Sequence, residues 1–436
     1  MAQPLTNFDA AHLLRRVGFG GSTSEISALV GMSRANAVDR VLDVSAAPSV
    51  TPFPTFDPSG QWPQYVEVIT WWLNRMVTSP TPIQEKLTLF WHGHFATAHS
   101  KVFNMVYMFG QNLTLRAGAL GNFGDLCNAI AVDPAMLEYL DNAHNVNVVV
   151  NENFARELME LFTLGVGNYT QADVVSMAKA WTGHNARGWN GTTYDYSYVF
   201  NADKHDFGTK TLFGIDRAWN GPDTIDEIVN GSKRPVCARF IARKLFRFFA
   251  HANPSDATVQ QHADAFIASN MSIRAVLRSI LVSDEFWAAS TRYARVKSPT
   301  EFAVDVIRRT GVPLRSSGLV EWALAPMGQW LMNPPNVAGW GQDEYWMNTS
   351  SAWARGGWLW FFRWVVNGTG FLAGIESRSA SEAVQMLFDS LGIIEPSSAT
   401  RSRLEAWFTD TMRTDSWYVR ANALVVGALT SDFQLA

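Results

Sequence analysis

Apolar residues recur every three to four positions along most of this chain, which is the spacing of one face of an α-helix. The pattern is clearest over residues 8–17, 82–91 and 151–164. Local signals mark where these helices begin, because Asn7 is a suitable N-cap and Pro82 suits a first helical turn. Further helices are expected over residues 24–42, 65–77, 129–141, 171–181, 224–229, 236–250, 255–269, 273–281, 299–309, 351–366, 380–391 and from 402 onward.

The pattern changes over residues 182–221, which are dense in Gly, Asn, Tyr, Trp and Asp. Within this stretch, residues 193–200 alternate in the manner of a β-strand. A β-hairpin or a long ordered loop fits best, and such insertions in compact proteins usually carry function. The chain is therefore expected to be all-α, with a small β-hairpin or long-loop insertion around residues 182–221.

A length of 436 residues exceeds what one hydrophobic core usually serves, so two or three domains are expected. Five prolines between residues 46 and 63 indicate a loop or linker. We expect N-terminal helices over 1–45, a proline-rich loop over 46–64, a main helical domain carrying the site over 65–350, and C-terminal helices packing on it over 351–436.

Composition excludes several classes of protein. Hydrophobic residues make up 47% and charged residues 17%, which rules out wholesale disorder. A net charge of -4 argues against nucleic-acid binding. The two cysteines, Cys127 and Cys237, are too few for a disulfide framework, although one disulfide between them stays open. No secretory signal or membrane span is evident, so a cytoplasmic location is the default expectation, with export of a related or mature form left open.

The first chemical candidate is the pair His92 and His94, with Gly93 between them. Their rings share one side only if the backbone is extended, because on a continuing helix they point about 200° apart. Gly93 suggests that the helix ends there. Neutral imidazoles on one side would suit zinc, iron or copper. The alternative is that one histidine hydrogen-bonds a buried carbonyl while the other is solvated.

A second candidate lies on the helix expected over residues 151–164. Glu152, Arg156 and Glu160 fall within about 80° on one helical face, flanked by Glu157. This arrangement fits a surface helix stabilised by ion pairs between residues four apart. It also fits a helix lining a cleft, where two close carboxylates hold different pKa values and one stays protonated.

Two further candidates lie in irregular segments. His205, Asp206 and Lys210 combine acid-base and charged groups in the polar insertion, where a turn with solvated charges is the alternative. The Asp-Phe-Gly at 206–208 lacks the other kinase motifs, so a kinase is rejected. Trp340 follows a Pro-Pro pair and lies between glycines, which suits an aromatic platform for a flat ligand or a structural plug.

Together these segments resemble a bacterial family known as domain of unknown function 1800. The resemblance runs in the family's order over nearly the whole chain, and it is carried by residues 12–20, 90–97, 152–165, 169–170, 180–183, 205–210 and 335–340. Members typically carry a histidine where this chain has Phe162, so any role of that imidazole does not transfer.

The resemblance brings no settled activity. Members often look exported and are often encoded beside proteins resembling sulfatases and alkaline phosphatases, an association that points to work on envelope or extracellular glycans. The family pattern also implies that the first three candidate groups belong to one site.

The leading hypothesis is a hydrolase acting on a glycan-type or other polar substrate through paired carboxylates with supporting histidines. The expected catalytic residues are Glu152, Glu157, His205 and Asp206, and the expected substrate-binding residues are His92, His94, Arg156, Trp189, Lys210 and Trp340. One alternative is a metal-dependent hydrolase or oxidoreductase, in which His92, His94 and His205, with Asp206 or Glu152, would bind a divalent metal. The other alternative is a non-catalytic binding or assembly protein.

Overall fold

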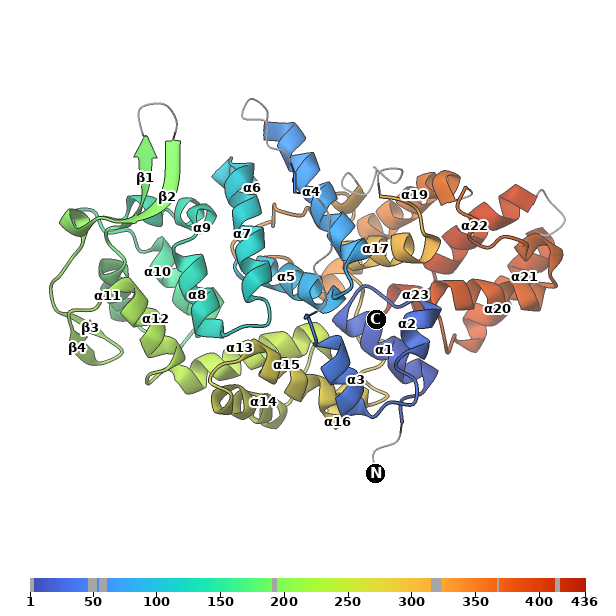
Figure 1. Cartoon of the computed structure of the whole chain (residues 1–436), viewed down its shortest axis with the longest axis horizontal. Helices are drawn as coiled ribbons and strands as arrows, with labels where there is room; N and C mark the ends of the chain where they lie inside the picture. Colours follow the sequence, from blue (N-terminus) through green and yellow to red (C-terminus); the bar gives the residue numbers. More distant parts are fainter. Residues whose placement is uncertain are drawn as a thin grey trace.

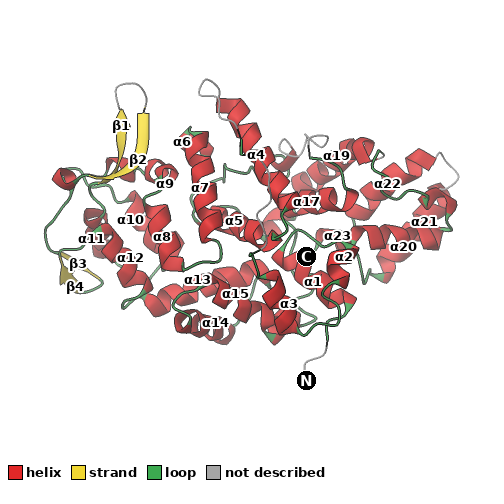
Figure 2. Cartoon of the chain, in the orientation of Figure 1, coloured by secondary structure: helices red, strands yellow, loops and turns green. Residues whose placement is uncertain are grey.

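The computed structural model describes residues 4–45, 53–54, 61–189, 194–314, 323–366, 368–411 and 416–436. Side chains are described in the same ranges except at 61–63, 188–189, 194–196 and 416–417. Helices dominate these residues and strands are few, so the mainly all-α prediction is confirmed (Figure 2).

The helices of the first half, with short 3-10 or π segments labelled η, are α1 Asn7–Val17, α2 Thr23–Ser27, α3 Arg34–Val41, α4 Gln61–Thr78, α5 Pro82–His94, α6 His99–Val102, α7 Met105–Gly118, α8 Phe123–Ala131, α9 Pro134–Tyr139, η1 Asn142–His144, α10 Asn153–Glu157, η2 Leu158–Thr163, α11 Gln171–Ala180 and η3 Ala202–Lys204.

Those of the second half are α12 Gly221–Val229, α13 Arg234–Phe249, α14 Asp256–Ala268, α15 Ile273–Val282, α16 Asp284–Trp287, α17 Pro299–Thr310, η4 Asp343–Trp346, α19 Thr349–Val366, η5 Ile375–Ser377, α20 Ala380–Leu391, α21 Ser398–Thr411, α22 Ser416–Ala428 and α23 Ser431–Gln434.

The strands of the described residues form two antiparallel hairpins, both inside the insertion predicted at residues 182–221. β1 His184–Trp189 pairs with β2 Tyr194–Phe200, and β3 Lys210–Leu212 pairs with β4 Ile215–Arg217. The pairing of β1 with β2 contains an irregularity between Ala186 and Gly188. The second hairpin packs against α11 (Figure 1).

The molecule is elongated, with its hydrophobic core in two clusters. Figure 1 shows the hairpins and α8 to α12 toward one end, α19 to α22 toward the other, and α1 to α3 and α23 between them. The first cluster draws mainly on α1, α3 and α8 to α15, and the second on α4, α17 and α19 to α22. Helices α5 and α7 join the two clusters, since Trp91 belongs to the first and Leu89 to the second. The expected domain boundaries stay a prediction.

Several helix boundaries differ from those that the sequence predicted; α4, for example, begins at Gln61 rather than at 65. Two of the differences have a clear local cause. The N-cap of α1 is Thr6, not Asn7, because the Thr6 hydroxyl accepts from the Asp9 backbone N–H while the Asp9 carboxylate accepts from that of Thr6. The single helix expected over 129–141 is two helices, α8 and α9. Asp133 caps α9 and Pro134 occupies its first turn, since proline cannot donate within a continuing helix.

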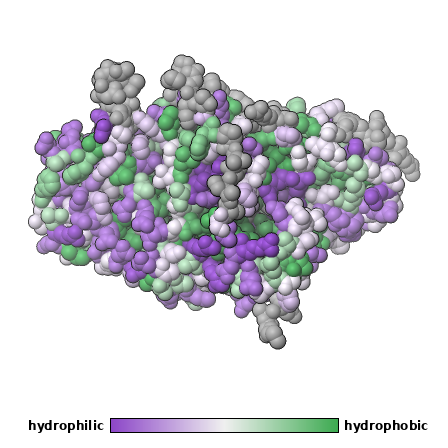
Figure 3. Space-filling view, viewed as in Figure 1, coloured by the Kyte–Doolittle hydropathy of each residue, from purple (hydrophilic) through white to green (hydrophobic). Residues whose placement is uncertain are grey.

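The surface carries polar and apolar residues side by side. Figure 3 shows hydrophilic and hydrophobic residues interspersed over the face seen in Figure 1. Among the described residues, no helix has both the length and the apolar character that crossing a membrane requires.

Candidate functional site

His92 and His94 diverge because α5 continues through Gly93 and ends at His94. The His92 ring packs against Trp72 at 5.5 Å and Trp340 at 5.4 Å between ring centroids. Burial lowers the pKa of His92 to about 4, so its imidazole is neutral at physiological pH. The helix ends one residue later than Gly93 suggested, so the extended backbone that would turn both rings to one side is not formed. His94 bonds a buried carbonyl, as the alternative proposed, but His92 is buried rather than solvated.

His94 is held between two elements that are distant in sequence. Its Nε2 lies 2.9 Å from the carbonyl oxygen of Phe162, and its Nδ1 lies 3.1 Å from Nζ of Lys244. A carbonyl only accepts, so Nε2 carries the proton and Nδ1 is left to accept from the lysine. Burial, followed by the nearby Lys244 charge, holds the pKa of His94 well below its ordinary value.

The Phe162 carbonyl is presented by a π-helical segment, η2, which continues directly from α10. The Leu164 backbone N–H donates to Met159 at 2.8 Å, five residues back. The carbonyls of Leu161 and Phe162 lie in the last turn of this segment, where the helix itself supplies no N–H partner. The Lys244 amine donates to the Leu161 carbonyl, and His94 Nε2 donates to the Phe162 carbonyl. π-helical turns of this kind are frequent at functional sites.

Lys244 on α13 contacts the expected site residue His94 and has a strongly lowered pKa. The side chain is half-buried, and its amine end is enclosed by His94 and by the Leu161 carbonyl at 2.9 Å. No acidic side chain of the described residues forms an ion pair with it. Burial, with a smaller contribution from Arg247, lowers the pKa of Lys244 to about 8.

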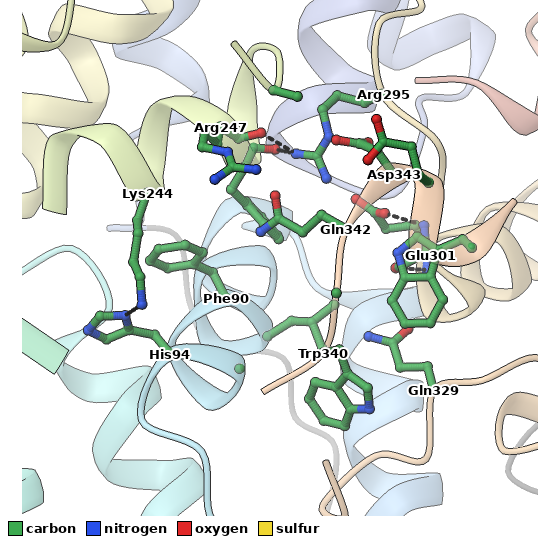
Figure 4. A pocket seen from close by; sticks show the side chains of 18 of the residues that line it. Phe90, His94, Lys244, Arg247, Arg295, Glu301, Gln329, Trp340, Gln342 and Asp343 are labelled. Atoms are coloured by element: carbon green, nitrogen blue, oxygen red, sulfur yellow. Dashed lines mark hydrogen bonds and ion pairs between the residues drawn. The ribbon is translucent and has the colours of Figure 1, made fainter. Parts of the chain in front are cut away.

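His94 and Lys244 line a pocket of about 290 Å³ between α5, α13 and the segment 338–346 (Figure 4). Its walls combine aromatic and charged side chains, among them Phe90, Arg247, Phe248, Arg295, Glu301, Trp340, Asp343 and Trp346. The pocket thus combines aromatic walls with convergent polar groups, which are the groups that orient a ligand in small-molecule sites.

The charges around this pocket are unevenly neutralised. Arg295 pairs with Asp343 at 2.7 Å, and Glu301 pairs with the buried Lys86. Although burial alone would raise it, Lys86 and then Arg295 lower the pKa of Glu301 to about 2. Arg247 is exposed at the rim, and none of the ion pairs among the described residues includes it. In the described part of the chain, Lys244 and Arg247 are thus two cationic groups of the pocket without an ion-pair partner, against one such carboxylate, that of the exposed Glu344.

Trp340 is brought to the pocket by a close approach of two glycines. Gly339 has a positive φ of 81°, and a Cβ there would collide with the carbonyl of Gly93. Gly93 in turn faces the Trp340 ring, which packs over His92. The segments 90–97 and 335–340, which the sequence analysis singled out separately, are therefore in direct contact.

Glu152 and Arg156 form a half-exposed ion pair of 2.9 Å between residues four apart. Gln171 bonds both side chains, at 2.9 Å in each case. Exposed pairs of this type contribute about 0 to 1 kcal/mol to stability. This geometry is the surface alternative that the sequence analysis weighed for these two residues.

Glu157 faces Glu160 rather than Glu152. Burial, and then the Glu160 charge, raise the pKa of Glu157. The Tyr169 hydroxyl donates to Glu160 at 2.5 Å, and burial together with this bond raises the pKa of Tyr169 to about 12. The two carboxylates are therefore inequivalent, with Glu157 the one that favours its proton.

His205, Asp206 and Lys210 lie together in the insertion, and the pocket beside Lys244 is not lined by any of them. The buried His205 ring bonds the Thr182 carbonyl through Nδ1 at 2.7 Å. The Asp206 carboxylate accepts from the Gly208 backbone N–H at 2.8 Å and lies 3.6 Å from the Lys210 amine. The backbone of Trp189 belongs to β1, but its side chain lies outside the described residues.

The structure does not gather the expected metal ligands. In the ranges that it describes, no three or more His, Cys, Asp or Glu side chains are arranged to hold a metal ion. Of the pair expected on α5, His94 has both ring nitrogens engaged and His92 is enclosed by tryptophans. Only His94 and Trp340, among the expected site residues, line the pocket described above.

Lys244, Arg247 and Glu301 were missed by the sequence analysis. Lys244 and Arg247 lie three residues apart on α13, where basic residues on an amphipathic helix usually mark a solvated face. Nothing local distinguishes Lys244, since its partner His94 is 150 residues away.

The fold and the site define a mainly helical protein with a lysine–histidine pair at a polar and aromatic pocket. The chain belongs to the family described as protein of unknown function (DUF1800), whose model matches residues 12–435. A comparison with curated proteins gave no match, and neither did a comparison with solved structures.

Proposed function

We propose that the protein is an enzyme that binds an anionic, ring-containing substrate of the carbohydrate type in the pocket beside Lys244. The observation that carries this proposal is the Lys244 amine, which is enclosed, lacks an acidic partner and opens onto a cavity. Amines with such lowered pKa values cluster at functional sites, because they are the ones able to exchange a proton near neutral pH.

The hydrogen bonds around Lys244 favour a role as a general base. A neutral amine has two N–H groups, and the acceptors His94 Nδ1 and the Leu161 carbonyl match them. The remaining lone pair is then free for a proton from water or from a substrate hydroxyl. In a hydrolysis, Lys244 would take the proton of the attacking water, and the departing hydroxyl group would recover a proton from solvent or from the ammonium.

Substrate recognition follows from the walls of the pocket. The Arg247 guanidinium at the rim suits a carboxylate, phosphate or sulfate group, which it can bind with two parallel hydrogen bonds. Trp340 is half-buried and offers a ring for stacking on a sugar. An acidic sugar would satisfy both features. The substrate expected from the sequence, a glycan, is thereby narrowed to one that carries an anionic group.

The proposal is tested by reductive labelling with pyridoxal phosphate, a phosphorylated aromatic aldehyde, followed by peptide mass spectrometry. We expect Lys244 to be labelled first at pH 8, and acidic sugars to protect it. Lys244→Met should lose this label and any hydrolysis of acidic oligosaccharides. Lys204→Met, at an exposed lysine outside the pocket, is the control. Labelling of Lys244 no faster than Lys204 would overturn the proposal.

A second candidate site for glycan hydrolysis is supported by the inequivalence of Glu157 and Glu160. A carboxyl group whose pKa is raised, next to a second carboxylate that accepts a hydrogen bond from a tyrosine hydroxyl, fits the two-carboxylate arrangement that glycoside hydrolysis uses. Comparing Glu157→Gln, Glu160→Gln and Lys244→Met on the same oligosaccharides separates the two. Loss of activity confined to the glutamate variants would favour the carboxylate pair.

A further inference from the structure

A second pocket lies between α11 and the β3–β4 hairpin, at the end of the molecule that carries both hairpins (Figure 1). Its volume is about 790 Å³. Three lysines from separate parts of the chain line it, Lys179 on α11, Lys210 on β3 and Lys233 just before α13. The proposed function uses none of them.

The positive charge of this pocket is poorly compensated. The only carboxylate among its lining residues is that of Asp173. Both oxygens of this group are occupied, one by the Phe213 backbone N–H at 2.7 Å and the other by the backbone N–H and hydroxyl of Thr170. Although burial alone would raise it, these hydrogen bonds lower the pKa of Asp173, so it stays ionised and fixed. Asp206 does not line the pocket, but its carboxylate lies 3.6 Å from the Lys210 amine and partly balances that charge. Lys179 and Lys233 are therefore the two lysines of the pocket that no ion pair of the described residues includes.

The three amines differ in how far they are already bound. Lys210 is buried and donates to the carbonyls of Asp206 and Gly208, so it supplies charge from the wall. Lys233 donates once, to the Asn168 carbonyl at 2.9 Å, which leaves two N–H groups. No hydrogen bond or ion pair among the described residues engages the Lys179 amine.

The lysines are close enough to repel one another. Burial lowers the pKa of Lys210, the Asp206 carboxylate offsets part of this shift, and the Lys179 charge adds to the lowering. Like charges gathered on one pocket destabilise the protein unless a counter-charge is bound. The hydroxyl groups of Ser176 and Thr209 line the same pocket and add neutral donors.

We propose that this pocket binds a tetrahedral oxyanion, the phosphate or sulfate group of a ligand, between Lys179 and Lys233 with Lys210 behind. Such a group accepts hydrogen bonds in several directions at once, which matches donors that come from different elements. It also neutralises more than one ammonium, which a single carboxylate does less well. The inference goes beyond the proposed function and does not depend on Lys244.

Calorimetric titration at constant ionic strength tests the proposal, with inorganic phosphate, inorganic sulfate, a hexose phosphate and the unmodified hexose as probes. We expect Lys179→Ala and Lys233→Ala each to weaken oxyanion binding at least ten-fold. Lys204→Ala, on an exposed lysine of the same insertion that does not line the pocket, should bind as the wild type does.

The pattern across the probes separates the sources of the anion. Lysine-dependent binding of inorganic phosphate or sulfate supports a free-ion site. Lysine-dependent binding of the hexose phosphate alone supports the proposal and assigns the anion to a modified sugar. Absence of binding by every charged probe, or equal affinity in wild type and both pocket variants, would overturn it. Labelling of Lys244 is unaffected by either result, so the two proposals can fail separately.

Discussion

Nζ of Lys244 lies 3.1 Å from Nδ1 of His94, and no carboxylate of the residues that the structure describes pairs with either group. Histidine–lysine contacts are stable only while one partner is neutral, and burial keeps the imidazole neutral here. The pair therefore shares a single positive charge at neutral pH, and that charge leaves when Lys244 titrates near pH 8.

The first prediction concerns Lys244→Met and pH. Because the folded-state pKa of Lys244 is about 8 and its ordinary value is 10.5, the charged lysine costs stability below pH 8, and this cost falls as pH rises toward 10.5. Methionine carries no such cost. The stability advantage of Lys244→Met over wild type should therefore shrink by roughly 1 to 2 kcal/mol between pH 7 and pH 9.5. The free energy of unfolding of both proteins should be measured at several pH values across this range. A difference between them that does not change with pH would contradict the prediction.

The second prediction concerns the two glutamates of the carboxylate pair. The raised pKa of Glu157 means that its ionised form costs free energy above the ordinary pKa of 4.5, so Glu157→Gln should keep or slightly raise stability at pH 7. Glu160→Gln exchanges a charged acceptor of the Tyr169 hydroxyl for a neutral one and should cost about 1 kcal/mol.

Thermal unfolding of the wild type and both glutamate variants at pH 7 and pH 4 checks these expected differences in stability. At pH 4 the Glu157→Gln variant should lose its advantage, since Glu157 is then protonated in the wild type as well. A large loss of stability in Glu157→Gln at pH 7 would instead mean that this carboxylate is held by a cation.

The third prediction concerns the glycine contact behind Trp340. Gly339→Ala should destabilise the protein by about 2 kcal/mol or more, because it adds left-handed strain and a collision with the Gly93 carbonyl. Gly374→Ala is a matched control, with a φ of 83° and open space around the glycine. It should show the strain alone, about 1 kcal/mol. Equal melting temperatures for the two variants would remove the close approach as a determinant of the pocket.

The fourth prediction concerns the cysteines, for which the sequence left one disulfide open. Cys127 and Cys237 are both free and buried. Burial raises the pKa of each thiol, so little thiolate forms at neutral pH. Iodoacetamide should leave both unmodified in the native protein and alkylate both after unfolding without reductant. A mass lower by two hydrogens in the unreduced protein would contradict this.

Local signals account for what could be predicted from the sequence. The capping box at Thr170 and Asp173 begins α11 where expected, and alternation over residues 193–200 marks β2. These features depend on neighbours within a few residues. The site depends on partners far apart in the chain, such as His94 and Lys244, which no local pattern connects.

The sequence predicted Glu152 and Glu157 as the catalytic carboxylates on this helix, whereas the carboxylate that acts on Glu157 is that of Glu160. Helical geometry at 100° per residue grouped Glu152, Arg156 and Glu160, but the helix widens into a π segment after Glu157. Glu152 pairs with Arg156 four residues on, and the charge of Glu160, three residues after Glu157, raises the pKa of Glu157. A regular helix also places both of these pairs side by side. What a helical wheel leaves out is the π segment itself, whose last carbonyls accept from His94 and Lys244.

The π segment makes the lysine–histidine pair sensitive to chain length rather than to side-chain chemistry alone. Removing one residue between Leu158 and Leu161 would restore an ordinary α-helical turn and rotate the two carbonyls by about 100° about the helix axis. His94 and Lys244 would keep their identities and lose the oxygens that orient them. A single in-frame codon deletion could therefore disconnect the site while leaving its side chains intact.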